Sequence, residues 1–318
     1  MTRLFPARSS HASAYPGLSR RASWLMTLST ALMLMASLLA APVQAAPAYT
    51  IDKMKDNVYR YTAGNYRSVF MVTTEGIVVT DPINPEAAAS LKAALQKEFN
   101  LPIKYMIYSH NHADHTLGGE VFKAAGATVV AQRYAAEDIA WTRLPTAMPE
   151  VTFKDKMTVS LGNSWVDLEY HGPNNGRGSI SMRFMPANVM YVVDWIVIGR
   201  MPYKDLQGYD IHGMIRSTRE ILAEPDFDLF VGGHAEKGSR EDVEQYLGYI
   251  EALYTAVRDG MLAGKDLPTL QQEIRLPAYK DLKMYDAWLP LNIEGVYNTF
   301  INDSYFRFRT DIPGQEKS

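Results

Sequence analysis

One short stretch of the chain concentrates side chains that could bind metal ions. Residues 109–115 read Ser-His-Asn-His-Ala-Asp-His, so three imidazoles and one carboxylate fall within six positions. They directly follow a β-branched and aromatic run at residues 103–108, which predicts a strand. Side chains alternate along extended backbone, so His110 and His112 point the same way and can bind one metal ion.

The turn beyond these two histidines offers a second set of ligands. Asp114 and His115 can reach another ion beside the first, and imidazole with carboxylate is a donor set that suits zinc. The chain contains no cysteine. This excludes a disulfide scaffold, a thiolate zinc site, an iron–sulfur cluster and a cysteine nucleophile.

The His-x-His-x-Asp-His pattern resembles the metal-binding motif of the metallo-β-lactamase superfamily, and the resemblance covers roughly residues 58–260. Three other segments, one before the motif and two after it, occur in the family's order. They are residues 76–81 ending in Asp81, residues 192–194 ending in Asp194, and residues 232–234 ending in His234. The resemblance implies a single-domain α/β fold, an αββα sandwich with the metals at its edge. It also implies that Asp194 bridges the metals, that His234 is a late ligand, and that Asp81 supports the metal loop from behind.

One position departs from the family pattern. The family's loop reads Gly-x-x-His-Thr, and its histidine completes the first metal site, whereas residues 172–178 of this chain place Asn175 there. A neutral amide oxygen is a weaker zinc ligand than imidazole. His171 is an alternative ligand, but only if the loop is rebuilt. We therefore expect either two zinc ions of unequal affinity or one zinc ion in the second site. The ligands of the first site would be His110 and His112 with Asn175 or His171.

The second site is complete in the sequence, with Asp114, His115, Asp194 and His234. The resemblance implies a zinc-dependent hydrolase in which a metal-bound hydroxide attacks an ester, lactone, amide, β-lactam or activated aryl halide of a small-molecule substrate. Asp114 or Asp194 would then orient the water and transfer its proton to the leaving group.

Two other functions stay open. One is an iron oxidoreductase like the family's dioxygenases, although these depend on the histidine that Asn175 replaces. The other is a non-enzymatic metal- or ligand-binding protein, although the retention of six ligand-type side chains argues against it.

The substrate-binding residues stay unassigned. Several aromatic and cationic side chains lie in loops or near ligand positions, and packing or solvation is the simpler interpretation of each. They are Tyr66, Arg67, Trp141, Arg143, Arg177, Trp195, Arg200, Tyr203, Lys237 and Arg240.

The hydrophobic periodicity and the turn residues predict alternating strands and helices. The expected strands are 69–72, 77–80, 103–108, 128–131, 157–161, 165–170, 179–184, 189–193 and 229–231, and the expected helices are 85–99, 119–126, 209–223 and 240–260. Asn84 is expected to cap the first helix, and Ser239 with Asp242 to form a capping box for the last.

Residues 1–45 have the features of an export signal. They carry four arginines and no lysine or acidic residue, and an apolar run at 24–41 precedes the small-x-small pattern Val43-Gln44-Ala45. The pair at residues 20–21 favours the twin-arginine route, with the Sec route as the alternative because Ser23 stands where a hydrophobic residue is usual. We expect a periplasmic protein without a stable membrane anchor after processing.

The rest of the chain is expected to form a metallo-β-lactamase-like domain at residues 46–265 and a tail at 266–318 that packs on it. The aromatic residues of the tail suit a core or a contact with a second copy, so a homo-oligomer stays open. The formal net charge is −3, and loss of the four arginines makes the mature protein more acidic. This balance disfavours a nucleic-acid partner.

The proposed signal can be tested by processing. We expect the mature protein, recovered from a periplasmic fraction, to begin directly after Ala45 or Ala46, as read by N-terminal sequencing. Replacing Arg20 and Arg21 by lysine should block export if the route is twin-arginine. Unchanged export of that variant would indicate the Sec route, and an intact Met1 on cytoplasmic protein would contradict the export prediction.

Overall fold

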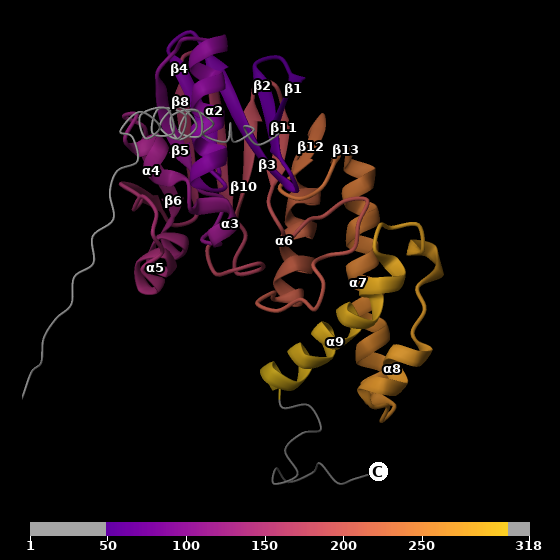
Figure 1. Ribbon diagram of the computed structural model, residues 1–318. Helices are drawn as coiled ribbons and strands as arrows, with labels where there is room; N and C mark the ends of the chain where they lie inside the picture. Colours follow the sequence, from indigo (N-terminus) through magenta and orange to yellow (C-terminus); the bar gives the residue numbers. More distant parts are fainter. Residues whose placement is uncertain (1–48, 305–318) are drawn as a thin grey trace, which may run out of the picture. The chain divides into compact units, whose positions relative to one another are not determined.

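Two β-sheets lie at the centre of the computed structural model, which describes residues 49–304 (Figure 1). The segment predicted as an export signal lies outside the described residues. The first sheet runs in the order β1 (Tyr49–Lys55), β2 (Val58–Ala63), β3 (Tyr66–Thr73), β4 (Gly76–Thr80), β5 (Ile103–Ile107), β6 (Thr128–Gln132) and β7 (Val151–Phe153). The second runs in the order β13 (Lys237–Gly238), β12 (Leu229–Gly232), β11 (Val189–Val192), β10 (Ile180–Met185), β9 (Ser164–Tyr170) and β8 (Lys156–Leu161).

The strands near the middle of each sheet are buried on both faces. Along β11, Val189 and Tyr191 belong to the core between the sheets, while Met190 and Val192 belong to the core on the opposite face. In β4, Val78 contacts the inter-sheet core, and Ile77 and Val79 contact the outer one. This alternation with period two explains why both strands read as continuous apolar runs.

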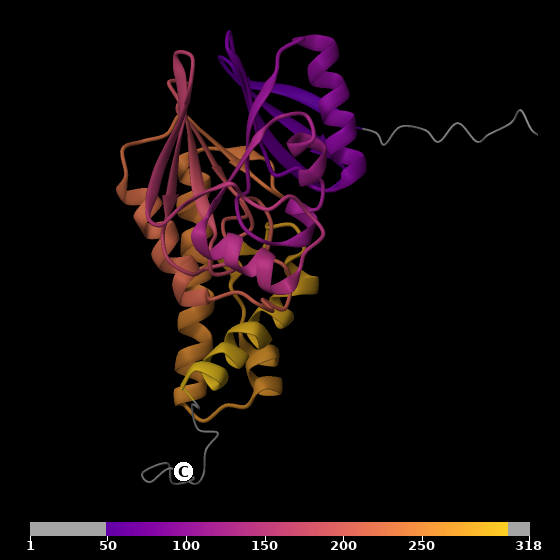
Figure 2. The same ribbon diagram turned by 90° about the vertical axis from the view of Figure 1, so that its left-hand side faces the viewer.

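Helices cover the outer face of each sheet. The first sheet carries α2 (Pro85–Glu98), α4 (Gly119–Lys123) and α5 (Arg133–Thr142), whose apolar residues share one core with the strands. The second carries α6 (Ile211–Ala223) and α7 (Arg240–Leu262), which bury a separate core. Figure 2 shows the indigo strands of the first sheet beside the rose strands of the second, with the orange helices outside. The layers are therefore α, β, β and α, as the sequence predicted.

The last part of the described chain is helical rather than a plain tail. It forms α8 (Leu267–Glu273), a 3-10 turn at Pro277–Tyr279 and α9 (Tyr285–Ser304). Ile293 and Val296 of α9 join the core that α7 forms with the second sheet. Figure 1 shows these yellow helices against α7.

The predicted capping residues are found at the N-termini of α2 and α7. Asn84 accepts a hydrogen bond from the backbone N–H of Ala87, and Ser239 and Asp242 form the capping box of α7. Strands β1, β2, β7 and β13 and helix α5 were not predicted from the sequence. β1 is an edge strand whose residues are exposed or half-buried, so it has no apolar alternation to detect.

A membrane-spanning helix is not found among residues 49–304, because no helix there is both long and apolar enough to cross a bilayer.

A buried asparagine joins three segments of the second half of the chain. Asn292 of α9 donates to the carbonyl oxygens of Pro202 at 3.2 Å and Lys204 at 2.7 Å, and it accepts from the Tyr249 hydroxyl of α7 at 2.7 Å. It thereby fixes the loop between β11 and α6 to two helices.

Removing this side chain should destabilise the protein. We expect Asn292→Ala to lower the free energy of unfolding by about 2 kcal/mol, because buried carbonyl and hydroxyl groups lose their partners. The exposed Asn298 lies on the same helix, and Asn298→Ala should change stability by less than about 0.5 kcal/mol. Urea denaturation of both variants measures the difference, and equal midpoints would contradict the role assigned to Asn292.

Candidate metal centre

The ends of four parallel strands bring the predicted ligands to one edge of the sandwich. Strands β4 and β5 run parallel in the first sheet, as do β11 and β12 in the second. The carboxyl ends of parallel strands meet at one edge, where loops carry functional residues. Asp81 follows β4, residues 108–115 follow β5, Asp194 follows β11 and His234 follows β12. The short helix α3 (Ala113–Thr116) turns Asp114 and His115 toward this edge.

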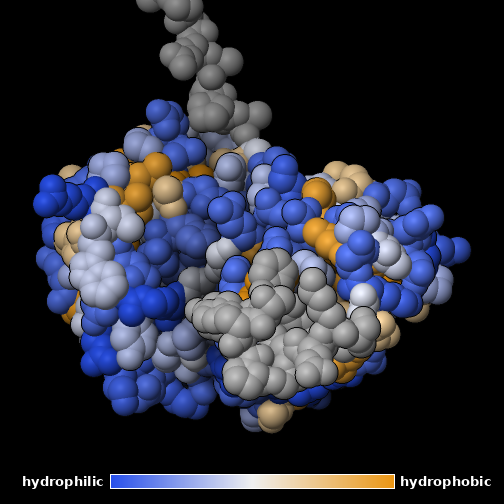
Figure 3. Space-filling model, turned by 90° about the horizontal axis from the view of Figure 1, so that it is seen from below, coloured by the Kyte–Doolittle hydropathy of each residue, from blue (hydrophilic) through white to orange (hydrophobic). Residues whose placement is uncertain are grey.

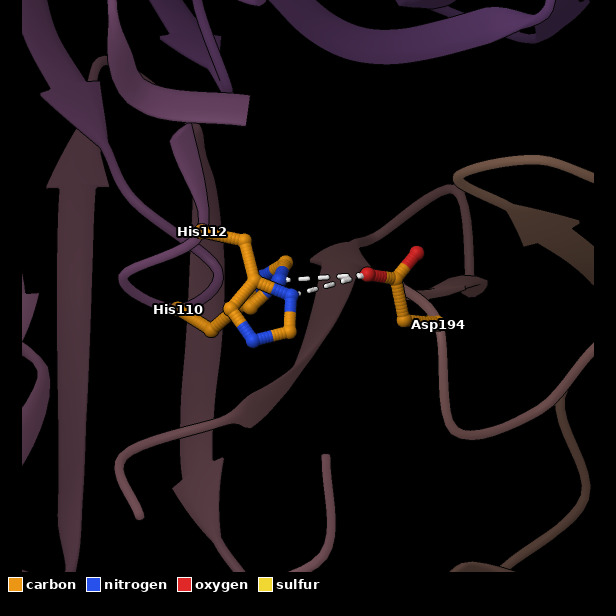
Figure 4. Close-up of side chains that lie close together, drawn as sticks. All are labelled: His110, His112 and Asp194. Carbon is orange, nitrogen blue, oxygen red and sulfur yellow. Dashed lines mark ion pairs between the residues drawn. The ribbon is translucent and has the colours of Figure 1, made fainter. Parts of the chain in front are cut away.

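The first group of ligand-type side chains is His110, His112 and Asp194. The Oδ2 atom of Asp194 lies 3.2 Å from Nε2 of His110 and 3.5 Å from Nδ1 of His112. Figure 4 shows both rings pointing at this carboxylate from the opposite side of the site. His110 is fully buried, and its other ring nitrogen lies 2.8 Å from the Ser109 hydroxyl. Partners of this kind fix the orientation of a ligating imidazole.

The second group is Asp114, His115 and His234. Nε2 of His234 lies 2.9 Å from Nε2 of His115 and 3.5 Å from Oδ2 of Asp114. The Nδ1 atom of His234 donates to the carbonyl oxygen of Asn65 at 3.0 Å, which turns its Nε2 atom toward the group.

Asp194 lies between the two groups. Its Oδ1 atom is 3.2 Å from Nε2 of His234 and 3.5 Å from Nε2 of His115, while its Oδ2 atom faces the first group. Each carboxylate oxygen thus faces two imidazoles. The resemblance implied that Asp194 bridges the two metal sites, and the structure places its carboxylate in contact with both groups.

A buried carboxylate holds the loop from behind. Asp81 is fully buried, accepts the backbone N–H of Ser109 at 2.8 Å and the Tyr191 hydroxyl at 3.3 Å, and lies 3.6 Å from Nδ1 of His115. Its place behind the metal loop is the one that the resemblance implied. Burial raises the pKa of Asp81, and the charge of His115 opposes this effect.

The carboxylates of the two groups stay ionised at neutral pH. Burial acts to raise the pKa of Asp194, but the charge of His115 and the nearby rings of His110 and His112 hold it well below its usual range. Burial likewise opposes ionisation of Asp114, yet the hydrogen bond from His234 helps lower its pKa to about 2. Burial and the neighbouring His112 lower the pKa of His110 to about 4, which keeps that ring neutral and able to bind a metal.

Several buried atoms of this cluster lack a hydrogen-bond partner. They are His110 Nε2, His115 Nδ1, Asn175 Oδ1 and Asp194 Oδ1. Buried polar atoms without partners are costly, and such groups in native proteins commonly serve an ion or a reaction. His110 Nε2 and Asp194 Oδ1 face the ligand groups, whereas His115 Nδ1 faces Asp81. The donor set and the first two of these atoms fit a divalent metal ion in each group.

The structure separates the two alternatives for the first group. The Nδ2 atom of Asn175 donates to Oδ2 of Asp194 at 2.9 Å, so this side chain lies at the cluster. The ring of His171 faces elsewhere, with Nε2 at 2.9 Å from the Ser181 hydroxyl and Nδ1 at 3.1 Å from Glu220. Rotating the Asn175 amide by half a turn would exchange the positions of its oxygen and nitrogen, so that the oxygen would lie at the cluster.

The neighbouring loop is fixed by α6. The backbone N–H of Asp210 donates to Asn174 at 2.7 Å, and the Asn174 amide donates to the Ser217 hydroxyl at 3.1 Å. Gly213 permits this approach, because a Cβ atom there would lie 1.9 Å from the carbonyl oxygen of Pro173.

A third group of side chains that could bind a metal consists of Glu169, His171 and Glu224. The negative charges of its two glutamates are already balanced by cationic side chains. Lys156 lies 2.6 Å from Glu169, and Arg183 lies 3.6 Å from Glu224. We assign no metal to it.

A cavity of about 570 Å³ opens beside the two groups and is lined by His112, Asp114, Asp194 and His234. Its volume is that of a small-molecule site. Figure 3 views the molecule from below and shows a mostly hydrophilic, hollowed face.

Three of the unassigned aromatic and cationic residues line this cavity, namely Tyr66, Arg200 and Tyr203. Others have structural partners: Arg177 pairs with Asp138, Arg240 with Asp226, and Trp195 is fully buried. The sequence missed Asn65, Tyr209 and Trp288 as cavity residues. Trp288 was one of the aromatic residues of the tail, for which the sequence favoured a core or a contact with a second copy over a substrate site.

Comparisons with known proteins agree with this geometry. The sequence model of the metallo-beta-lactamase superfamily matches residues 61–234 of this chain. The alpha subunit of 2,4-dinitroanisole O-demethylase from Nocardioides sp. is 28% identical over 225 residues, covering 70% of this chain and 68% of that protein. A metallo-beta-lactamase type 2 from Elizabethkingia meningoseptica is 25% identical over 221 residues, covering 65% of this chain and 87% of that protein. The solved structure of a metallo-beta-lactamase from Pontibacter korlensis superposes with a TM-score of 0.58 at 16% identity, covering 64% of this chain and 99% of that one.

An αββα sandwich with paired His and Asp groups at the ends of its parallel strands is the metallo-β-lactamase type of fold. The chain belongs to the metallo-β-lactamase superfamily, and the matched residues include every predicted metal ligand. Helices α8 and α9 lie beyond the matched residues.

Loss of a second-group histidine should weaken metal binding. We expect His115→Ala and His234→Ala each to lower the zinc bound per chain and to reduce activity to below about one hundredth, because the group keeps only two of its three ligands. His212 of α6, which lies against Tyr254, provides the control variant His212→Ala. Zinc content by elemental analysis is the measurement, and wild-type content in either variant would refute the ligand assignment.

Variants of the loop residues test the first group. We expect Asn175→His to raise zinc occupancy above that of the wild type, because imidazole is a stronger zinc ligand than an amide. His171→Ala should leave occupancy unchanged, since its ring faces Ser181 and Glu220. Titration with zinc reports both. Loss of one zinc in His171→Ala would show that His171 is a ligand after all.

Proposed function

We propose that this chain is a zinc-dependent hydrolase of a small-molecule substrate. The observation that carries the proposal is the position of Asp194, whose two carboxylate oxygens each face two imidazoles. The ionised carboxylates, the unpartnered buried atoms and the adjoining cavity support it. Bound zinc would lower the pKa of water to about 7 and polarise the group under attack.

The residues of the chain divide the remaining work. Asp194 is nearly inaccessible, so its task is to hold the two groups at a fixed separation. The Asp114 carboxylate is 44% exposed and lines the cavity, so it can accept a proton from a bound water molecule and return it to a leaving group. The Asn175 amide can donate a hydrogen bond to an oxygen that gains negative charge, in addition to holding Asp194.

The bond cleaved is proposed as a class. Esters, lactones, amides, β-lactams and activated aryl halides all react with an activated water, and one scaffold hosts many such reactions. One relative is named for a β-lactamase and another for O-demethylation of 2,4-dinitroanisole. The second name adds activated aryl ethers to the class. We propose that the substrate is met in the periplasm, after removal of residues 1–45, and that nucleic acid is not a partner.

Metal removal and a substrate panel test the proposal together. The purified mature protein should hold zinc, hydrolyse at least one substrate class, lose that activity after chelation and regain it with added zinc. The panel contains an ester, a lactone, an amide, a β-lactam, an aryl halide and an aryl ether. If activity is lost only in the chelated sample, turnover depends on the metal.

Other outcomes separate the alternatives. Stoichiometric iron together with dioxygen consumption would contradict the hydrolase and favour an iron oxidoreductase. Full metal occupancy without turnover anywhere on the panel would favour a metal-binding protein.

A further inference from the structure

An arginine without a carboxylate partner lines the cavity beside the metal centre. Arg200 lies in the loop that follows Asp194 and is half-buried. Its Nε atom is buried without a hydrogen-bond partner, and no carboxylate among residues 49–304 forms an ion pair with it, although Asp194 attracts its charge from a greater distance. A guanidinium keeps its charge at every physiological pH, and a partly buried charge is costly without a counter-ion. The other acidic and histidine side chains lining this cavity are His112, Asp114, Asp194 and His234, and all four are predicted metal ligands.

Two aromatic rings stand next to this guanidinium. The Cζ atom of Arg200 lies 5.4 Å from the ring centroid of Trp288, which itself lies 5.5 Å from the ring of Tyr203 at an interplanar angle of 81°. The Tyr203 side chain is 54% exposed although it is large and apolar. Trp288 comes from α9, beyond the residues that match the family description. The C-terminal helix thus adds to the cavity a wall that the matched region does not provide.

We propose that Arg200, Tyr203 and Trp288 form a binding subsite for an aromatic ring that carries a negatively charged group. The anion, a carboxylate or sulfonate, pairs with the Arg200 guanidinium, whose planar fork suits two oxygen atoms. The ring of the ligand packs against Tyr203 and Trp288. This subsite rests on the proposed function for its purpose, since it would place the remaining part of a substrate at Asp114 and the metal groups.

Three small probes of similar size test the subsite on the zinc-loaded protein. They are benzoate, the neutral aromatic benzamide and the non-aromatic anion cyclohexanecarboxylate, with dissociation constants measured by isothermal titration calorimetry. Benzoate should bind about tenfold more tightly than either analogue, as expected for a charge-assisted hydrogen bond and an aromatic contact.

Variants assign each preference to a side chain. Arg200→Gln should abolish the preference for benzoate over benzamide, and Trp288→Leu the preference for benzoate over cyclohexanecarboxylate. Arg200→Lys and Trp288→Phe should keep part of each preference, which separates a lost contact from a misfolded protein. Arg219→Gln and Trp141→Leu are matched controls at exposed positions outside the cavity and should retain both preferences.

Some results would overturn the subsite. Absence of benzoate binding, equal affinity for the three probes, or unchanged benzoate affinity in Arg200→Gln would each do so, the last because the carboxylate would then bind the metal alone. Binding with the expected preferences but no hydrolysis on the substrate panel would contradict only the proposed function. Hydrolysis without these preferences would contradict only the subsite.

Discussion

The carboxylate of Asp194 is the constraint on which the arrangement of this site depends. Its two oxygen atoms lie 3.2–3.5 Å from four imidazole nitrogens, which belong to two segments of the chain. Three of these histidines follow β5 of the first sheet and one follows β12 of the second, so the carboxylate joins the two sheets at their shared edge. Asp194 adopts a left-handed backbone conformation with φ of 70°, which is unusual for a residue other than glycine. The surrounding contacts must stabilise that conformation.

Outside the metal groups, the chain builds its cavity from less regular parts. The loop between β11 and α6 supplies Arg200, Tyr203 and Tyr209, and α9 supplies Trp288. Asn292 fixes this loop to α7 and α9 by hydrogen bonds to backbone oxygens and to Tyr249. The sandwich therefore positions the groups proposed for chemistry, while the loop and the C-terminal helix shape the space in which a substrate would lie. This division explains how one scaffold accommodates different substrates.

The sequence predicts the layers and the metal loop because both leave local patterns. The spacing of His110 and His112 after a strand follows from the period of extended backbone, and Asp194 and His234 were found through their order along the chain relative to that motif. Asn175 was placed correctly at the cluster as a departure from a family pattern, but its contact with Asp194 depends on loop geometry that no spacing reports. Arg200 and Trp288 could not be paired from sequence, because their proximity arises from the packing of α9 against a distant loop. The helical nature of the C-terminal segment was also missed, since Pro290 interrupts its pattern.

The most direct test of this account is the metal content of the Asp194→Asn variant, which keeps the size of the side chain and removes its charge. If Asp194 holds both groups together, zinc per chain should fall substantially below that of the wild type, with the folded state retained by circular dichroism. Zinc content equal to that of the wild type in a folded Asp194→Asn protein would contradict the central role assigned to this carboxylate.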